Sequence, residues 1–265
     1  MALIAADREI IDVEMPDDSA SLAVITDWHD GSPTFKKAAA AAWIEMIRDN
    51  GWLWLGNGDL IENALRQSLG DIYAQEISPD EQVDSIVERL SPIKHLCIGM
   101  VSGNHGQRSM KQAGLDPDRH IARLLDVPYR QYTLHARIKL SDSNNTVWSV
   151  IAHHTTGGGR TSGAKLTALK RLAELCPTAD LYIGGHSHSD LSASDRYQDF
   201  PGNQGGEICY RIRRFSGCGS LLDYGGSYAE AKMFPPASQC QVVHHLGGKV
   251  GRNKIREYDR RVYQF

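Results

Sequence analysis

Residues 22–29 read LAVITDWH, an apolar run that ends in an aspartate and a histidine two positions apart. Such a run predicts a buried strand with Asp27 and His29 just beyond its end. Four further apolar runs end in the same way: residues 52–55 before Asp59 and Glu62, 96–101 before Asn104 and His105, 148–152 before His153 and His154, and 181–183 before His186 and His188. In a largely parallel sheet the loops that follow the strands converge at one edge, because all the carboxyl ends lie there. The five runs therefore predict one site where metal-binding side chains meet.

Segments with helical spacing separate these runs, so the predicted order is β–α–β–α. The pair Ser32-Pro33 predicts the start of a helix, with the serine as cap, and Asn50-Gly51 predicts its end. Ser78-Pro79-Asp80-Glu81 is typical of a capping box at the start of a second helix. Apolar residues recur at helical spacing over residues 116–125 and 164–175, which predicts two more helices.

The last third of the chain has a different pattern. Residues 138–140 and 146–150 flank Asp142-Ser143-Asn144-Asn145 and predict two strands joined by a turn. Beyond residue 190 the helical spacing fades, and residues 208–215 and 241–246 predict further strands. Because there is no linker rich in proline and serine and no internal repeat, we predict one α/β domain over residues 1–265, with a second sheet completed by the C-terminal third.

The composition argues against several classes of protein. The 29 basic and 32 acidic residues give a formal net charge of −3, so there is no overall attraction to nucleic acid or to an anionic membrane. No apolar run is long enough to span a bilayer, and the acidic start of the chain lacks the pattern of a secretory signal. The five cysteines are scattered without a Cys-x-x-Cys pair, which favours reduced thiols over disulfides or a thiolate zinc site. These features predict a cytoplasmic protein without a membrane partner.

The residues at the strand ends indicate which kind of ion would bind. The predicted ligands are Asp27, His29, Asp59, Asn104, His153, His186 and His188. Carboxylates with imidazoles suit a borderline transition metal, whereas calcium prefers oxygen ligands alone. Seven ligands are too many for one tetrahedral ion but fit two ions that share a bridge, for which Asp59 is well placed after Gly58. Because pairs of ions about 3.5–4 Å apart serve in-line displacement at phosphorus, the set predicts phosphate-ester chemistry.

Residues beside the predicted ligands leave choices open. His154 competes with His153, and we favour His153 because it comes first after the apolar run and its neighbour must face the other way. We expect Glu62 to support a ligand rather than to bind metal. His244 and His245 are adjacent in a predicted strand and face opposite ways, so we expect structural roles for both.

Five motifs, in this order, resemble the calcineurin-like metallophosphoesterase superfamily, whose pattern is D-x-H, G-D-x-x-[D/E/N], G-N-H-[E/D], a strand-end histidine and G-H-x-H. Here they are Asp27-Trp28-His29, Gly58-Asp59-Leu60-Ile61-Glu62, Gly103-Asn104-His105-Gly106, His153 and Gly185-His186-Ser187-His188. The resemblance covers about residues 20–190 and is specific, because five motifs must coincide in order. It implies a four-layer α/β/β/α sandwich of two mixed sheets flanked by helices. It also implies two divalent transition-metal ions, with manganese expected first and iron, zinc, nickel or cobalt as alternatives.

The resemblance further assigns roles by position. One ion would take Asp27, His29, His188 and Asp59, and the other Asp59, Asn104, His153 and His186. His105 would be the catalytic histidine beside the scissile phosphate. The chain departs from the pattern at Gly106, where the family usually has an acid that orients this histidine. The stretches 78–82, 103–108 and 225–230 are similar to those of small phage or prophage-type members.

Two arginines are candidates for substrate binding. Arg160 lies in the glycine-rich loop of residues 155–163, where a guanidinium could hold phosphate oxygens, although a plain surface loop explains the pattern equally well. Arg108 and Asn104 are placed near the catalytic histidine and are the other candidates. Arg211, Arg213 and Arg214, with residues 249–261, form basic clusters that could serve a nucleic-acid backbone or simply be solvated strand faces.

We therefore expect a dinuclear metal-dependent hydrolase of phosphate esters, most simply a phosphodiesterase for nucleotide-type or other small phosphodiesters. In this prediction Asp59 bridges the ions and His105 protonates the departing oxygen or stabilises phosphoryl charge. A nuclease or nucleic-acid end-processing enzyme and a phosphomonoesterase are the alternatives, and a non-catalytic binding module ranks last because no ligand is lost. The sequence does not determine the oligomeric state.

Overall fold

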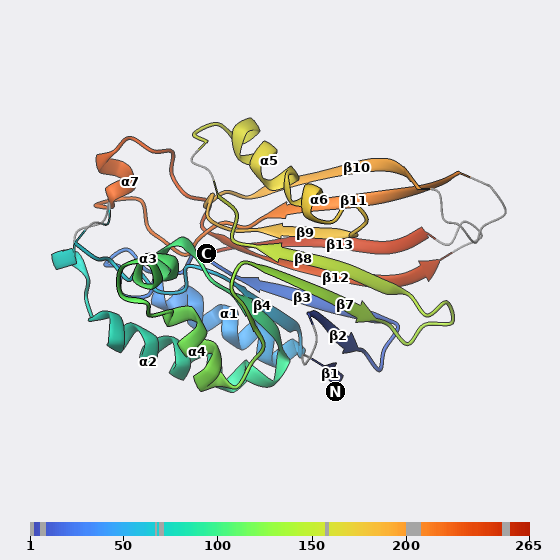
Figure 1. Cartoon of the computed structure of the whole chain (residues 1–265), viewed down its shortest axis with the longest axis horizontal. Coiled ribbons are helices and arrows are strands. Elements are labelled where there is room, and N and C mark those ends of the chain that lie inside the picture. Colours follow the sequence, from blue (N-terminus) through green and yellow to red (C-terminus); the bar gives the residue numbers. More distant parts are fainter. Residues whose placement is uncertain are drawn as a thin grey trace.

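Two mixed β-sheets lie face to face in the computed structural model (Figure 1). The structure describes residues 3–5, 9–66, 68, 72–156, 159–199, 208–250 and 255–265. The seven-stranded sheet has the order β1 (Leu3–Ala5), β2 (Ile10–Glu14), β7 (Thr133–Lys139), β8 (Val147–His153), β9 (Leu181–Gly184), β11 (Cys209–Gly217) and β10 (Leu191–Asp199). The six-stranded sheet has the order β13 (Ile255–Gln264), β12 (Cys240–Val250), β3 (Ser19–Ile25), β4 (Leu53–Asn57), β5 (Cys97–Val101) and β6 (Tyr129–Arg130).

An apolar layer joins the two sheets. Leu22, Leu55 and Ile98 of the six-stranded sheet share one buried cluster with Trp148 and Ile183 of the seven-stranded sheet. Because β-strand side chains alternate between the two faces, residues on the opposite faces of both sheets are free to pack against helices. The middle of the molecule is therefore a sheet-on-sheet interface.

Helices cover the outer faces. Three helices pack on the six-stranded sheet in one buried cluster: α1 (Lys37–Asn50), α2 (Pro79–Leu90) and α4 (Pro117–Leu125). The helices α5 (Ser162–Lys170) and α6 (Leu172–Leu175) pack on the outer face of the seven-stranded sheet. The remaining helical elements are α3 (Asn104–Ala113), α7 (Tyr228–Ala231) and the 3-10 turns η1 (Ile72–Ala74) and η2 (Ser91–Leu96). The order helix, sheet, sheet, helix confirms the predicted four-layer sandwich.

The predicted start of the first helix is wrong. α1 begins at Lys37 rather than after Ser32, and no side chain caps it. Phe35 stacks on Trp28 with ring centroids 6.2 Å apart and forms a β-bridge with Leu222. These contacts fix the segment before α1 as a turn, so tertiary packing overrides a good local capping signal.

Of two other predicted helices, one begins as predicted and the other is divided in two. The capping box is confirmed, since Ser78 N donates to Glu81 Oε2 at 2.8 Å and Glu81 N donates back to the serine hydroxyl at 3.4 Å. The single helix expected over residues 164–175 is divided at Arg171 into α5 and α6.

The strand directions place the candidate site. Strands β3, β4 and β5 run parallel in one sheet, and β8 and β9 run parallel in the other. All five predicted ligand-bearing runs are therefore strands. The predicted metal ligands lie at the ends of these strands, in the loops that follow them or at the start of α3. None of the helices in the described part of the chain is both long and apolar enough to cross a membrane.

Candidate metal centre

The loops after β3 and β4 run side by side and hold their backbones in unusual conformations. Asp27 N donates to Gly58 O, and His29 N donates to Asp59 O, both at 3.1 Å. Positive φ angles between 47° and 65° occur at five predicted ligands: Asp27, His29, Asp59, His186 and His188. A left-handed conformation costs a non-glycine residue about 1–2 kcal/mol. Such strain persists where the surrounding structure enforces it, typically at functional sites.

The loop after β5 touches the loop after β4 through two glycines. A Cβ at Gly58 would lie 2.7 Å from the Cα of Gly103, so a side chain cannot be accommodated there. This close approach brings Asp59 to the first turn of α3, where His105 N donates to Asp59 Oδ1 at 2.9 Å. The amino end of a helix favours negative charge, so α3 stabilises the carboxylate.

One group of possible ligands consists of Asp27, His29 and His188. His188 Nε2 lies 3.1 Å from Asp27 Oδ1 and 3.3 Å from His29 Nε2. Asp27 is fully buried, and its carboxylate also accepts a hydrogen bond from His186 N at 3.0 Å. The three side chains come from the loops that follow β3 and β9, so this group joins the two sheets.

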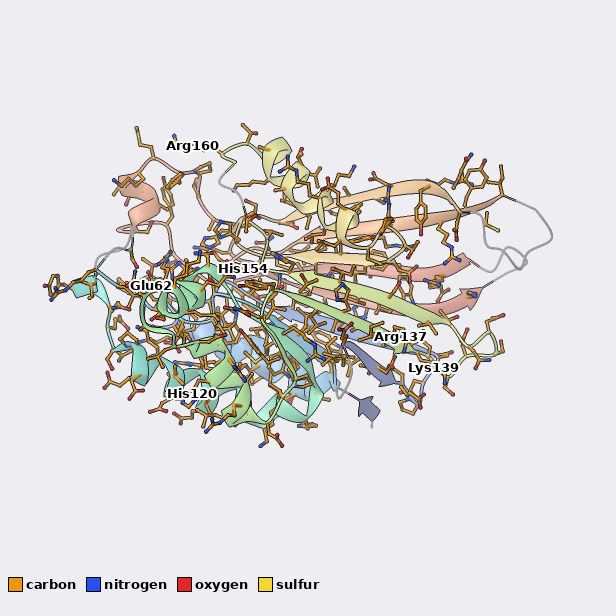
Figure 2. The ribbon with its side chains drawn as sticks, in the orientation of Figure 1. Glu62, His120, Arg137, Lys139, His154 and Arg160 are labelled. Atoms are coloured by element: carbon orange, nitrogen blue, oxygen red, sulfur yellow. The ribbon has the colours of Figure 1, made fainter. Side chains whose placement is uncertain are left out.

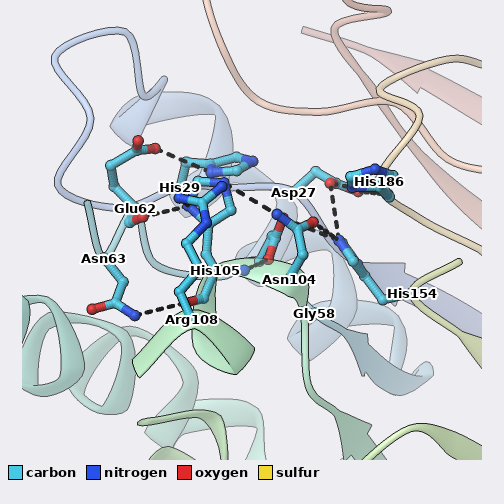
Figure 3. A network of polar contacts seen from close by, with 12 residues as sticks. Asp27, His29, Gly58, Glu62, Asn63, Asn104, His105, Arg108, His154 and His186 are labelled. Carbon is cyan, nitrogen blue, oxygen red and sulfur yellow. Dashed lines mark hydrogen bonds and ion pairs between the residues drawn. The ribbon is translucent and has the colours of Figure 1, made fainter. Parts of the chain in front are cut away.

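A second group consists of Asp59, His154 and His186. His154 Nε2 lies 3.0 Å from Asp59 Oδ2 and 3.9 Å from Asp27 Oδ1, so it connects the two groups (Figure 3). The amide of Asn104 points into this group. Its inward atom lies 2.9 Å from Asp59 Oδ2, 3.2 Å from His154 Nε2 and 2.6 Å from His186 Nδ1.

The structure places His154, and not His153, in the centre, so the favoured choice from sequence is wrong. Trp148, Val150 and Ala152 of β8 all belong to the apolar layer between the sheets. His154 continues this alternation and therefore faces the six-stranded sheet, where Asp59 lies. His153 has the opposite orientation, is only partly buried, and accepts a hydrogen bond from Thr155 N at 2.7 Å.

Glu62 contacts His29, and with His29 and His105 it forms a third group of possible ligands. Its Oε2 lies 3.1 Å from His29 Nδ1, while the other ring nitrogen of His29 faces His188. Burial alone would lower the pKa of His29, but the hydrogen bond and charge of Glu62 raise it above the ordinary histidine value. A carboxylate on the far nitrogen fixes the tautomer and orientation of a metal-binding histidine.

His105 is held by backbone groups. Its Nδ1 contacts the carbonyl oxygen of Glu62, and its own carbonyl accepts from Asn63 Nδ2 at 2.7 Å (Figure 3). Its Nε2 lies 3.8 Å from Asp59 Oδ2, so the ring borders the second group. Burial lowers the pKa of His105 to about 4. The carbonyl oxygen of Glu62 therefore orients this ring.

The two candidate arginines lie in different places. Arg108 is next to the centre: one Nη atom lies 3.5 Å from His105 Nδ1, and the other lies 3.3 Å from the outward atom of the Asn104 amide. Arg160 lies beside the start of α5 (Figure 2), where its guanidinium covers the ring of Phe234. Gly157 and Gly158 of the predicted glycine-rich loop lie outside the described residues.

The buried carboxylates of Asp27 and Asp59 would be stabilised by a bound cation. Burial would raise the pKa of Asp59, yet it lies well below the usual carboxyl value because His154 and His105 are close. Burial likewise opposes a charge on His154, but the carboxylates of Asp59 and Asp27 raise its pKa to about 10. Two buried carboxylates thus share a proton-bearing imidazole. A divalent ion would supply the same compensation, because unpaired buried charges are strongly disfavoured.

The donor atoms also fit a metal. When His154 is neutral, as a metal-binding histidine must be, an inward Asn104 oxygen faces only Asp59 Oδ2 and two histidine nitrogens that can offer lone pairs. Lone pairs that converge without a hydrogen-bond donor are suited to a cation. The chain thus brings together six of the seven predicted ligands, with His154 in place of His153. The mixture of carboxylate, amide and imidazole matches divalent transition metals.

Comparison with known proteins gives the fold. Neither a protein-family model nor a curated protein matches the sequence. Among solved structures, the chain is similar to the calcineurin-like phosphoesterase YfkN from Bacillus subtilis, with 16% identity, a TM-score of 0.50, and 94% of this chain and 91% of that one covered. It also aligns with YfcE, a phosphoesterase from E. coli, at 16% identity and a TM-score of 0.43, over 90% of this chain and 98% of that one. A third match is Vps29 from Chaetomium thermophilum, at 9% identity and a TM-score of 0.33, over 92% and 95% of the two chains. The likeness to YfkN confirms the predicted fold.

Proposed function

We propose that this chain, which has the fold of calcineurin-like phosphoesterases, is a metal-dependent hydrolase of phosphate esters. One observation carries the proposal: side chains from the ends of five strands in two sheets converge on one buried point. A likeness in fold would not by itself identify a function, because one fold serves many reactions. The converging ligands supply the chemical argument.

Two divalent ions are the proposed cofactors. We assign Asp27, His29, His188 and Asp59 to one ion, and Asp59, Asn104, His154 and His186 to the other. When bound, divalent ions supply Lewis acidity toward phosphoryl oxygens. The proximity of Asp59 to His154 and to His105, and that of His154 to Asp27, support Asp59 as the group between the two sets. Manganese remains the first expectation for the metal.

The remaining residues hold and protonate the substrate in this proposal. His105 borders the second ligand group and would give a proton to the departing oxygen, with its ring oriented by the Glu62 carbonyl. Arg108 is the nearest of the two candidate arginines to His105 and would hold a phosphoryl oxygen. Asn104 would share in stabilising the charge that develops on the phosphoryl group.

We favour a phosphodiesterase for nucleotide-type or other small diesters over a nuclease. The basic clusters that suggested nucleic acid are largely engaged within the protein. Ion pairs join Arg211 to Asp199, Arg256 to Asp180, Arg260 to Asp190 and Arg261 to Asp259. Arg213 and Arg214 lie over the rings of Tyr197 and Tyr258. These contacts leave fewer free cations for a phosphate backbone.

The test is hydrolysis by metal-loaded protein of a panel containing 4-nitrophenyl phosphate, bis(4-nitrophenyl) phosphate, a cyclic nucleotide and single-stranded DNA. We expect turnover of a diester that depends on added manganese and falls by orders of magnitude in Asp59→Asn. Hydrolysis of the monoester alone would instead support a phosphomonoesterase. Lack of turnover on every substrate, with ions bound, would support a non-catalytic binding module.

Other parts of the prediction also remain proposals. A single domain over residues 1–265 is supported by the shared apolar layer between the sheets. Cytoplasmic location is supported by four of the cysteines, Cys97, Cys176, Cys218 and Cys240, which are free thiols. The similarity to phage-type members stays a prediction.

A further inference from the structure

A cleft with a cavity volume of about 640 Å³ opens beside the metal centre. His186, His188 and Glu62 line one end of it, and Leu222, Tyr224 and Phe234 line the other. Small-molecule sites typically have volumes of about 300–1,000 Å³, with apolar walls and a few polar groups. A phosphate group alone would fill little of this space. The cleft therefore has room for the organic part of a substrate.

The apolar part of the cleft is formed by the loop of residues 222–234. Hydrogen bonds within this loop hold its backbone in place. Tyr224 Oη donates to Phe234 O at 2.9 Å, and Phe234 N donates to Ala229 O at 2.8 Å. Leu222 anchors the start of this loop, because it bridges to Phe35 and packs against the core of the α1 side. The structure thus fixes the position of the Phe234 ring relative to the centre.

Arg160 reaches the same part of the cleft from the residue before the cap of α5. Its guanidinium lies 5.0 Å from the centroid of the Phe234 ring, and both residues line the cleft. Thr161 caps α5 by accepting from Ala164 N at 3.3 Å, which fixes the start of the helix next to Arg160. A guanidinium and a phenyl ring together form a platform on which planar rings stack well.

The cleft also has a charge that favours anions. Arg160, Lys165 and Lys232 line it, against the carboxylates of Glu62 and Asp223. Both carboxylates already have partners: Glu62 contacts His29, and Asp223 lies 3.7 Å from Lys36 Nζ. The lining of the cleft therefore carries three cationic side chains against two carboxylates.

We propose that this cleft binds the ring-bearing substituent of a nucleotide-type phosphate ester, with the planar ring stacked on the Arg160 guanidinium, which Phe234 supports from its other side. The inference rests on the proposed function, since it places the phosphate group at the metal centre. It narrows the substrate class to esters with a planar aromatic group within reach of the phosphate. Simple alkyl phosphates would leave the platform uncovered.

Calorimetric titration of the manganese-loaded protein tests this, with adenosine 5′-monophosphate and methyl phosphate as probes. Both carry a phosphate, and only the first carries a ring. Stacking on aromatic side chains changes affinity by about 5- to 150-fold per base, so we expect the nucleotide to bind at least about tenfold more tightly. Phe234→Leu and Arg160→Gln should each reduce the ratio of the two affinities. Arg123→Gln, an exposed site on α4, should leave the ratio unchanged.

The outcomes separate the two proposals. Equal affinities for the two probes, or a ratio unchanged in both cleft variants, would overturn the cleft assignment while leaving the hydrolase intact. Equal losses for both probes in Arg160→Gln would show that this arginine contacts phosphate rather than the ring. If neither probe binds, the cleft assignment falls, whereas the hydrolase proposal is decided by the hydrolysis panel. Manganese-dependent hydrolysis, measured separately, tests the proposed function alone.

Discussion

The carboxylate of Asp118 occupies the space that a side chain at Gly106 would enter. Asp118 reaches this point from α4 and is buried there, which raises its pKa to about 7. Its Oδ2 accepts from Ser102 Oγ at 2.8 Å and from Gly103 N at 3.1 Å. An acid from another helix thus stabilises the turn that carries Asn104 and His105. The glycine at position 106 is what makes room for it.

Gly106→Ala should therefore destabilise the protein by about 1–3 kcal/mol, the usual cost of overpacking a filled interior. The added methyl group would displace the Asp118 carboxylate and break its hydrogen bonds. Chemical denaturation of both forms measures the difference in unfolding free energy. Gly163→Ala is the matched control, because a Cβ there would contact nothing within 4 Å. In an Asp118→Ala background the cost of Gly106→Ala should shrink, and equal costs in both backgrounds would contradict the coupling.

Neighbouring histidines at the end of β8 give a second prediction. His154→Ala should lose one metal ion, because His154 faces Asp59 and the inward amide atom of Asn104. His153→Ala should keep both ions, because His153 faces away from the centre. Elemental analysis after metal loading and removal of free ions reports the stoichiometry. Loss of an ion in the His153 variant alone would show that the two side chains exchange places when metal binds.

Glu62 gives a third prediction, since it acts on metal through His29 rather than by direct contact. Replacing a group that orients a metal-binding histidine typically costs about 10- to 100-fold in affinity. Glu62→Gln keeps the shape but removes the charge next to His29 Nδ1, so affinity at one ion should fall within that range. Competition titration with a metal-binding dye measures the affinity. Glu88→Gln, at an exposed position of α2, should have no effect, and a loss in Glu62→Gln below twofold would argue against the support role.

Apolar runs and motif order were sufficient to predict part of the fold. The five ligand-bearing strands and the four layers followed from apolar runs and motif order, because burial on both faces leaves a strong continuous pattern. β10 was missed, since every second residue of this edge strand is polar and exposed. α3 was missed too, because it begins inside a motif and buries few residues.

The error at His153 has a physical cause that the sequence already contained. Counting from the end of the apolar run ignored the alternation of side chains along β8. Trp148, Val150 and Ala152 define the inner face, and the same parity selects His154. By contrast, no local pattern could have revealed Asp118 or Phe234. Asp118 comes from the helix that follows α3 and Phe234 from the last third of the chain, and only tertiary packing defines the place of each.

His105 gives a fourth prediction, which separates proton transfer from metal binding. If His105 protonates the departing oxygen, His105→Ala should keep both ions and lose about 10²–10⁴-fold in rate on esters of alkyl alcohols. The loss should be small on 4-nitrophenyl esters, because nitrophenolate departs without a proton. Rates measured across leaving groups of different pKa, with metal content checked in parallel, test this. Equal losses across the series would assign His105 to stabilising phosphoryl charge.

His244 gives a fifth prediction, on stability rather than activity. This histidine is fully buried on β12 next to Tyr258, with its Nδ1 3.0 Å from the Tyr258 hydroxyl. Burial, with smaller effects of Arg260 and His245, lowers its pKa from 6.5 to about 3. Between these two pH values the unfolded chain binds a proton at His244 that the folded chain does not. The unfolding free energy should therefore decrease as the pH falls through this window and be unaffected by His244 above it.

The size of this effect follows from the two pKa values. At pH 5 the linkage amounts to about 2 kcal/mol, since the slope approaches about 1.4 kcal/mol per pH unit. His244→Leu removes the titrating group, so its unfolding free energy relative to the wild type should rise by about that amount between pH 8 and pH 5. Arg123→Gln, at an exposed position of α4, leaves His244 and its surroundings in place and serves as the control, whose difference from the wild type should stay constant with pH. Denaturant unfolding at both pH values measures all three proteins. Parallel pH dependence of the wild type and His244→Leu would mean that the folded protein also accepts this proton, and that His244 is not held neutral by burial.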